Sequence, residues 1–327
     1  MRDIAVFSGG AHPALAAEIC AELSLEVQPS RVTRFANDCL EVQLQANCRE
    51  RDVFLIQPLV APVQENLVEL LLMIDAARGA SAGRVTVVMP HYAYARSDKK
   101  DAPRISIGGR LMADLLVASG ADRVLTMTLH SPQVHGFFSV PVDHLNALGE
   151  LAAHFAGQDL ANSVVVSPDL GNAKEAAAFA RLLGVPVAAG AKQRYPDDRV
   201  AITSVIGNIE GRDVIVLDDE IAKGSTVIEL IRVLREQGVR RIQVACTHGL
   251  FAGEALRRIS DLPEVTSVVC TNTVPINPAE AAAAPPGMLT VLSIAPVVAE
   301  AIRRIHDGES VSSLFDRPTP VEGRSLF

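Results

Sequence analysis

Residues 214–226 read Val-Ile-Val-Leu-Asp-Asp-Glu-Ile-Ala-Lys-Gly-Ser-Thr, and this stretch is the most informative part of the chain. The four apolar residues 214–217 predict a buried strand, and the apolar positions after Thr226 recur with the period of a helix. The acidic pair Asp218 and Asp219 is expected at the carboxyl end of that strand, before a loop of small residues. Strand, loop and helix in this order are the repeating unit of an α/β protein.

The polar residues of this stretch have the chemistry of a sugar-phosphate cradle. Free N–H groups at a helix start bind phosphate with help from the helix dipole, and the two carboxylates suit ribose hydroxyls. The motif is not a P-loop, which places its lysine after a second glycine. An ordinary strand-to-helix turn with solvated acids is the alternative. The loop residues are Ala222, Lys223, Gly224, Ser225 and Thr226.

The same alternation of strand and helix patterns continues along the chain. It predicts a mainly parallel sheet with helices on both faces, repeated in two similar domains. We expect a first domain at 1–145, a second at 146–315 that includes the last helix, and a mobile tail at 316–327. The expected strands are 4–7, 53–56, 85–89, 124–127, 164–166, 214–217, 242–247 and 265–270, and the expected helices are 13–23, 66–77, 108–119, 173–183, 227–236 and 295–306.

Composition limits the class of protein. The 327 residues are enough for two domains, and no apolar run approaches the roughly 18 residues of a membrane span. A net charge of −8, no tryptophan and 4% aromatic residues argue against a nucleic-acid partner. The five cysteines lack metal-type spacing, and the first strand leaves no room for a signal peptide, so a cytoplasmic protein is expected.

Polar residues follow several strands, where open α/β sheets bind their ligands. The basic loop 91–100 suits nucleotide phosphates, with a solvated charged loop as the alternative. His130 and Asp169 follow corresponding strands in the two halves and could hold Mg²⁺. A structural histidine and a helix-capping aspartate are the alternatives.

Two further segments are informative only in combination. Lys192 and Arg194 precede a polar stretch, 195–199, with the composition of a mobile lid, and two cations could clamp a transferring phosphoryl group. A surface loop is the alternative. Residues 35–38 precede an expected strand at 40–44, where a simple turn is the default.

In this order, these segments resemble the ribose-phosphate pyrophosphokinase family, also called PRPP synthetases, over almost the whole chain. The resemblance implies two domains of the type I phosphoribosyltransferase fold. The stretches that carry it are 7–9, 70–76, 94–96, 120–127, 136–138, 141–143, 247–249, 271–273 and 310–315.

The resemblance also implies a reaction, in which the pyrophosphoryl group of ATP moves to the 1-hydroxyl of ribose 5-phosphate. Asp218, Asp219 and the 222–226 loop would hold ribose 5-phosphate, and Lys192 and Arg194 match the family's catalytic pair. His130 and Asp169 match its Mg²⁺ positions. Phe35 and Asn37 would come from a neighbouring subunit, which implies a homo-oligomer, commonly a hexamer built of dimers. The nucleotide-binding set is Phe35, Asn37, Asp38, Cys39, Arg96, Ser97, Asp98 and Lys99.

The chain departs from the family pattern at several positions. Thr128 replaces a carboxylate beside the metal position, and Asn172 replaces a glycine. Ala222, Lys223 and Ser225 change the cradle loop. These departures favour testing one alternative, a catalytically silent relative that binds ligand and regulates a partner. A phosphoribosyltransferase that uses PRPP is a second alternative, but it needs only one such domain.

Overall fold

The computed structural model describes residues 3–194 and 200–314. Contacts divide these residues into two compact units. The first unit comprises 3–146 and 293–314, and the second comprises 147–292. The division lies one residue after the predicted boundary, and the last helix, α9 (Ala295–Asp307), groups with the first unit rather than with the second. The predicted tail, 316–327, lies outside the described residues.

The first unit is built on a five-stranded parallel sheet with the order β1-β4-β5-β6-β7. An antiparallel hairpin, β2 and β3, follows α1 in the chain. The strands are β1 (Ile4–Ser8), β2 (Ser30–Arg34), β3 (Leu40–Leu44), β4 (Asp52–Ile56), β5 (Arg84–Met89), β6 (Arg123–Met127) and β7 (Val142–Leu145). The helices, besides α9, are α1 (Pro13–Glu22), α2 (Val63–Gly79), α3 (Gly108–Ala118) and the short turns η1 (Ala93–Arg96), η2 (Pro132–Phe137) and η3 (Ser312–Leu314).

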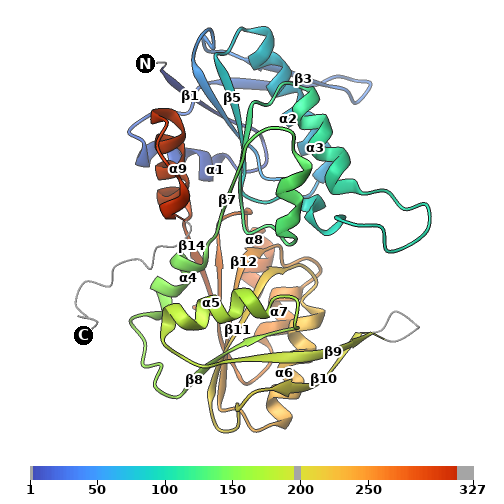
Figure 1. Ribbon diagram of the computed structural model, residues 1–327, viewed down its shortest axis with the longest axis vertical. Coiled ribbons are helices and arrows are strands. Elements are labelled where there is room, and N and C mark those ends of the chain that lie inside the picture. The colour runs from blue at the N-terminus through green and yellow to red at the C-terminus, as the bar shows by residue number, and fades with distance from the viewer. Residues whose placement is uncertain (1–2, 195–199, 315–327) are drawn as a thin grey trace. The chain divides into compact units, whose positions relative to one another are not determined.

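Both faces of this sheet are covered, as its apolar strands require. Alternate strand residues point to opposite faces, and Phe7, Leu55 and Val87 pack in one core with Leu70 of α2 and Leu116 of α3. Figure 1 shows α1 and α9 next to each other on the other side of the sheet. The intervening strand residues, such as Val6, Phe54 and Val88, are buried as well. Burial on both faces explains why these strands are continuous apolar runs rather than alternating ones.

The second unit has a seven-stranded sheet with the order β10-β9-β8-β11-β12-β13-β14. β9 and β10 form an antiparallel pair, and the other neighbours are parallel. The strands are β8 (Ser163–Ser167), β9 (Val187–Arg194), β10 (Val200–Ile206), β11 (Asp213–Ile221), β12 (Arg241–Gly249), β13 (Val265–Thr271) and β14 (Leu289–Leu292). The helices are α4 (Leu148–Phe155), α5 (Ala173–Leu183), α6 (Ser225–Glu236), α7 (Ala255–Ser260) and α8 (Pro278–Ala283).

Two hydrophobic cores sandwich this sheet. One contains Phe155 of α4 and Phe179 of α5 against Ile215 and Leu217 of β11. The other contains the apolar face of α6, including Ile231, and packs against the alternate strand residues. The helices therefore divide into α4 and α5 on one face and α6 and α7 on the other, the arrangement of a doubly wound sheet.

The order of strands reverses between β8 and β11. From β8 the chain adds β9 and β10 on one side, and from β11 it adds β12, β13 and β14 on the other. Loops leave the two central strands in opposite directions at such a point, which opens a crevice at their carboxyl ends. The residues after β8 and the last residues of β11 therefore occupy the position where this fold binds ligands.

The predicted fold class, an α/β protein with mainly parallel sheets flanked by helices, is confirmed. Every expected strand and helix is present within a few residues, and the strand expected at 40–44 is β3. The sequence patterns missed short or polar strands, such as β2, β7 and β14. They also missed the antiparallel pair β9 and β10. In the parts of the chain that the structure describes, no helix is long and apolar enough to cross a membrane.

Candidate active site

The acidic pair lies within β11 rather than after it, which corrects the predicted strand 214–217. β11 continues to Ile221. Its pairing with β8 ends at Val216, whereas its pairing with β12 continues through Asp218 opposite Cys246 to Ile221 opposite Gly249. Carboxylates are poor strand formers, so the sequence pattern stopped too early. Pairing with β12 along one edge keeps the acids in extended backbone at the crevice.

The two carboxylates are held close together. The backbone N–H of Asp219 donates to Asp218 Oδ1 at 3.0 Å. Burial raises the pKa of Asp218 well above its usual value, and the charges of Asp219 and Asp169 raise it further. Two like charges at a desolvated site are unfavourable unless donors or cations compensate them. Hydroxyl donors of a sugar would supply that compensation.

The cradle loop connects β11 to α6 and is fixed from the α7 side. The N–H of Ala252 donates to the Ala222 carbonyl at 2.9 Å, and Arg258 Nη1 donates to the Lys223 carbonyl at 3.4 Å. Gly224 has φ 70° at the N-cap of α6, a left-handed conformation that glycine adopts without strain. The helix begins at Ser225, slightly earlier than predicted.

The start of α6 has the groups that a phosphate requires. The backbone N–H of Ile228 donates to the carbonyl of the N-cap residue Gly224 at 2.9 Å. The N–H groups before Ile228 belong to the first turn, where a helix has no internal acceptors for them. The side chain of Lys223 is exposed beside them. Backbone donors, the helix dipole and one cation make this end of α6 suitable for an anion.

Asp169 lies in a turn at the carboxyl end of β8. Its Oδ1 accepts the N–H groups of Gly171 at 2.9 Å and Asn172 at 3.2 Å. The Asn172 side chain in turn donates to the carbonyl of Leu217, the residue before Asp218, at 3.0 Å. The predicted alternative of a helix cap is only partly right, because these N–H groups precede α5. The turn brings Asp169 to the same edge as the acidic pair.

Asp169 has the chemistry of a Mg²⁺ ligand. Its carboxylate is a hard oxygen donor that two N–H groups orient, and its charge contributes to the high pKa of Asp218. In the described ranges no group of three or more His, Cys, Asp or Glu side chains could hold a metal by itself. Mg²⁺ does not require such a cage, because it usually takes one or two carboxylates together with water and phosphate oxygens. His130, the other predicted ligand, belongs to the first unit.

Lys192 and Arg194 are the last residues of β9, so the alternative of a surface loop is wrong for them. Their backbones pair with Ile202 and Val200 of β10. Only the backbone is described at these two positions. The predicted lid at 195–199 lies outside the described residues.

In the first unit the basic loop folds against the start of α3. Ser97 Oγ accepts the N–H of Gly108 at 2.8 Å, and the N–H of Gly109 donates to the Ser97 carbonyl at 2.9 Å. Tyr92 Oη donates to the Gly109 carbonyl at 2.8 Å. Ser97 therefore has a structural role in positioning this loop, and Arg96 beside it is exposed.

The structure joins this loop to the segment that contains His130. Ser131 Oγ donates to Asp98 Oδ2 at 2.7 Å, and Lys99 lies 3.8 Å from Asp98. His130 is exposed next to the buried Ser131. Two segments that are about 30 residues apart in the chain thus meet at the carboxyl ends of β5 and β6.

His144 of β7 is a supporting residue that the sequence patterns missed. Its Nε2 accepts the N–H of Leu129 at 2.8 Å, directly before His130. Burial, with a smaller effect of His135, lowers the pKa of His144 to about 4. The ring is therefore neutral at physiological pH and can act as an acceptor. Its position on a short strand with little apolar pattern left no signal in the sequence.

Phe35, Asn37, Asp38 and Cys39 form the turn between β2 and β3. Asn37 Oδ1 accepts the N–H of Cys39 at 3.3 Å, and Arg34 Nη1 lies 2.6 Å from Asp38 Oδ1. The expected turn is therefore present, as the connection of a hairpin. The side chain of Phe35 is 48% exposed in this turn. The role of this turn in nucleotide binding stays a prediction.

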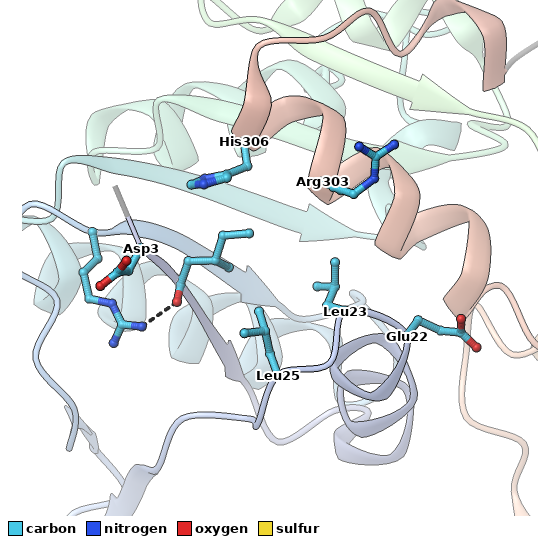
Figure 2. Close-up of a pocket in the computed structure, with 8 residues that line it drawn as sticks. Asp3, Glu22, Leu23, Leu25, Arg303 and His306 are labelled. Atoms are coloured by element: carbon cyan, nitrogen blue, oxygen red, sulfur yellow. Dashed lines mark hydrogen bonds between the residues drawn. The ribbon is translucent and has the colours of Figure 1, made fainter. Parts of the chain in front are cut away.

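A pocket of about 520 Å³ lies elsewhere in the first unit. Figure 2 shows Leu23 and Leu25 on one side of it and Arg303 and His306 of α9 on the other. Arg303 forms ion pairs with acidic neighbours, and His306 Nδ1 lies 2.9 Å from the buried Asp52. None of the predicted site residues lines this pocket. His306 therefore attaches α9 to β4, whereas these ion pairs of Arg303 are with other residues of α9.

Comparison with known proteins identifies the family of the chain. Residues 4–120 match the N-terminal domain of ribose phosphate pyrophosphokinase, and residues 192–316 match the phosphoribosyl synthetase-associated domain. The chain belongs to the ribose-phosphate pyrophosphokinase family.

Individual relatives cover nearly the whole chain. A putative ribose-phosphate pyrophosphokinase of Streptomyces coelicolor is 75% identical over 97% of this chain and 98% of its own length. The ribose-phosphate pyrophosphokinase of Deinococcus radiodurans is 49% identical over 95% and 97%. The crystal structure of phosphoribosylpyrophosphate synthetase from Mycobacterium smegmatis superimposes with a TM-score of 0.86 and 38% identity, covering 94% of this chain and 100% of that one.

Proposed function

We propose that this protein is an active ribose-phosphate pyrophosphokinase, which converts ATP and ribose 5-phosphate into 5-phosphoribosyl 1-diphosphate and AMP. The observation that carries the proposal is the acidic end of β11, followed by the α6 start, at the strand reversal of the second sheet. Membership of the family over nearly the full chain supports the same activity.

The acceptor sugar is assigned to the second unit. Asp218 and Asp219 accept hydrogen bonds from ribose hydroxyls, and the raised pKa of Asp218 falls back when those donors arrive. The first-turn N–H groups of α6 and Lys223 bind the 5-phosphate. This division leaves the 1-hydroxyl as the nucleophile. No covalent intermediate is needed, because phosphoryl transfer depends mainly on positioning and on neutralisation of charge.

The nucleotide is assigned to the first unit. Arg96 stacks on the base, and Ser97, Asp98 and Lys99 line the phosphate side of the loop that Ser131 supports. The turn of Phe35, Asn37, Asp38 and Cys39 contributes from a neighbouring copy of the chain. The exposed ring of Phe35 supports such a contact. The assembly that follows from the family resemblance is a hexamer built of dimers.

Lys192 and Arg194, at the end of β9, are assigned to neutralise the negative charge that develops on the transferring group. Removal of one such donor typically lowers the rate by about 10²–10³. In the second unit Asp169 would hold Mg²⁺, which would neutralise charge on the phosphate oxygens. In the first unit His130 is the residue assigned to Mg²⁺. Asp219 polarises the ribose hydroxyl.

Two other functions are less well supported for this protein. A silent regulatory relative would not need Lys192, Arg194, Asp169 and Asp218 together, and all four are present. A phosphoribosyltransferase would leave the first unit and its basic loop unexplained.

The test is incubation of the full-length chain with ATP, Mg²⁺ and ribose 5-phosphate, followed by mass spectrometry of the products. We expect AMP and 5-phosphoribosyl 1-diphosphate in equal amounts. Retained ribose 5-phosphate binding with no AMP formed would instead support the silent relative. Formation of ADP would show transfer of a single phosphoryl group and would contradict the assigned reaction.

A further inference from the structure

We propose that Gly190 of β9 is a positioning residue for the reaction, because its missing side chain sets the distance between the catalytic strand and the Asp169 turn. The inference rests on the proposed function. Gly190 is buried, two residues before Lys192, and it lies in the second unit together with the residues it contacts.

The backbone of β9 passes too close to the Asp169 turn for any side chain. A Cβ atom built on Gly190 would lie 2.5 Å from the carbonyl oxygen of Pro168 and 3.3 Å from Ile202 Cγ2. The first distance is about 1 Å shorter than an ordinary van der Waals contact, and its partner is backbone rather than the end of a movable side chain. A side chain here would therefore separate β9 from the residue directly before Asp169.

The Asp169 turn cannot simply move away. Asp169 Oδ1 holds the N–H groups of Gly171 and Asn172, and the Asn172 side chain donates to the Leu217 carbonyl at 3.0 Å. The turn is therefore tied to β11 at the residue before Asp218. β9 is paired with β8 only up to Ala189, so it is the part that would shift.

The pairing of β9 with β10, along its other edge, is irregular near the same residue. The pairing with β10 is regular up to Gly190 opposite Val205 and Ala191 opposite Ser204, and then skips Thr203 before Lys192 pairs with Ile202. Thr203 Oγ1 donates to the Ala191 carbonyl at 3.2 Å. Bulges of this kind redirect a strand and are common beside active sites.

These contacts place three functional elements on one rigid frame. Gly190 fixes β9 against the turn, the turn carries Asp169, and Asn172 links the turn to the acidic end of β11. A displacement at Gly190 is transmitted along the extended backbone to Lys192, two residues further on. Misplacement of a reacting group by about 1 Å can lower a rate by about 10²-fold, while the cradle itself would keep its geometry.

The test compares Gly190→Ala with Gly157→Ala, a glycine of the same unit with nothing within 4 Å of a built Cβ. The measurements are kcat, the ribose 5-phosphate KM, direct ribose 5-phosphate binding by calorimetry, and Tm. We expect Gly190→Ala to lower kcat about 10- to 100-fold, with KM and ribose 5-phosphate affinity within about twofold of the parent. Gly157→Ala should match the parent in every measurement.

A second variant covers the case in which Gly190→Ala does not fold. Thr203→Val removes the hydrogen bond to Ala191 at an exposed position, and we expect kcat to fall about threefold at constant KM. Parental kcat in a folded Gly190→Ala protein overturns the inference, as does parental kcat in Thr203→Val when the first variant is unfolded. Equal losses of kcat and sugar binding in either variant also overturn it. A parent protein that makes no AMP contradicts the proposed function instead.

Discussion

The two sheets carry polar residues at their carboxyl ends in different ways. In the first unit the strands follow one another in chain order, and the predicted nucleotide residues lie on loops that hydrogen bonds fasten, such as Ser97 to Gly108 and Asp98 to Ser131. In the second unit the strand order reverses, and the acidic pair lies on the strand itself. Loops can be adjusted at low cost, whereas a strand fixes its carboxylates even when their charges repel each other.

The largest effect should come from Lys192→Ala, which removes a cation assigned to the transition state and leaves the acidic cradle unchanged. We expect kcat to fall about 10²–10³-fold while ribose 5-phosphate affinity stays nearly the same. Steady-state kinetics and calorimetry with ribose 5-phosphate check this. Equal losses of turnover and binding would show that Lys192 acts in the ground state.

Asp218→Asn tests whether holding the Asp218 carboxylate in β11 makes the folded protein less stable. Because the folded state raises the pKa of Asp218, ionisation at neutral pH destabilises the fold, and a neutral amide should stabilise it by up to about 2 kcal/mol. The ribose 5-phosphate KM should rise by at least about tenfold, since two acceptor oxygens become one. Urea unfolding and kinetics measure the two effects. A less stable variant would contradict the repulsion.

His144 offers the corresponding test in the first unit. Its pKa is lowered to about 4, so the unfolded chain, with an ordinary value near 6.5, binds more protons between these two values. Stability from this group is complete above pH 6.5 and should decrease below it by at most about 1.4 kcal/mol per pH unit down to about pH 4.

The measurement for His144 is the free energy of unfolding in urea at pH 7 and pH 5. The control is His144→Gln, which can still accept the Leu129 N–H but does not titrate. The free energy of unfolding of the parent, minus that of the variant, should be smaller at pH 5 than at pH 7. A constant difference would mean that the buried ring is not held neutral.

The smallest effect should come from Lys223→Thr, in the cradle loop. Lys223 is exposed, so we expect the ribose 5-phosphate KM to rise only about three- to tenfold, with kcat unchanged. The parent should lose affinity as salt rises, and the variant should lose less. The same salt dependence in both proteins would show that Lys223 does not face the phosphate.

Much of the fold could be predicted from the sequence because both sheets are buried on both faces. The apolar runs of β4, β5 and β11 have few other interpretations, and α5 begins and ends where its pattern predicts. The edge elements could not be predicted in this way. β7 and β14 have four residues each, and β9 is rich in small residues, so their pairing depends on neighbours distant in the chain.

The sequence by itself determined the residue types of the site and their order, because a sugar phosphate requires acids, a helix start and a cation whatever the details of the fold. The tertiary structure decided which of these residues meet. It extended β11 through Asp218, brought Asn172 to Leu217, and placed Gly190 against Pro168. These relations depend on strand pairing and on close backbone approach, and neither leaves a periodic pattern in the sequence.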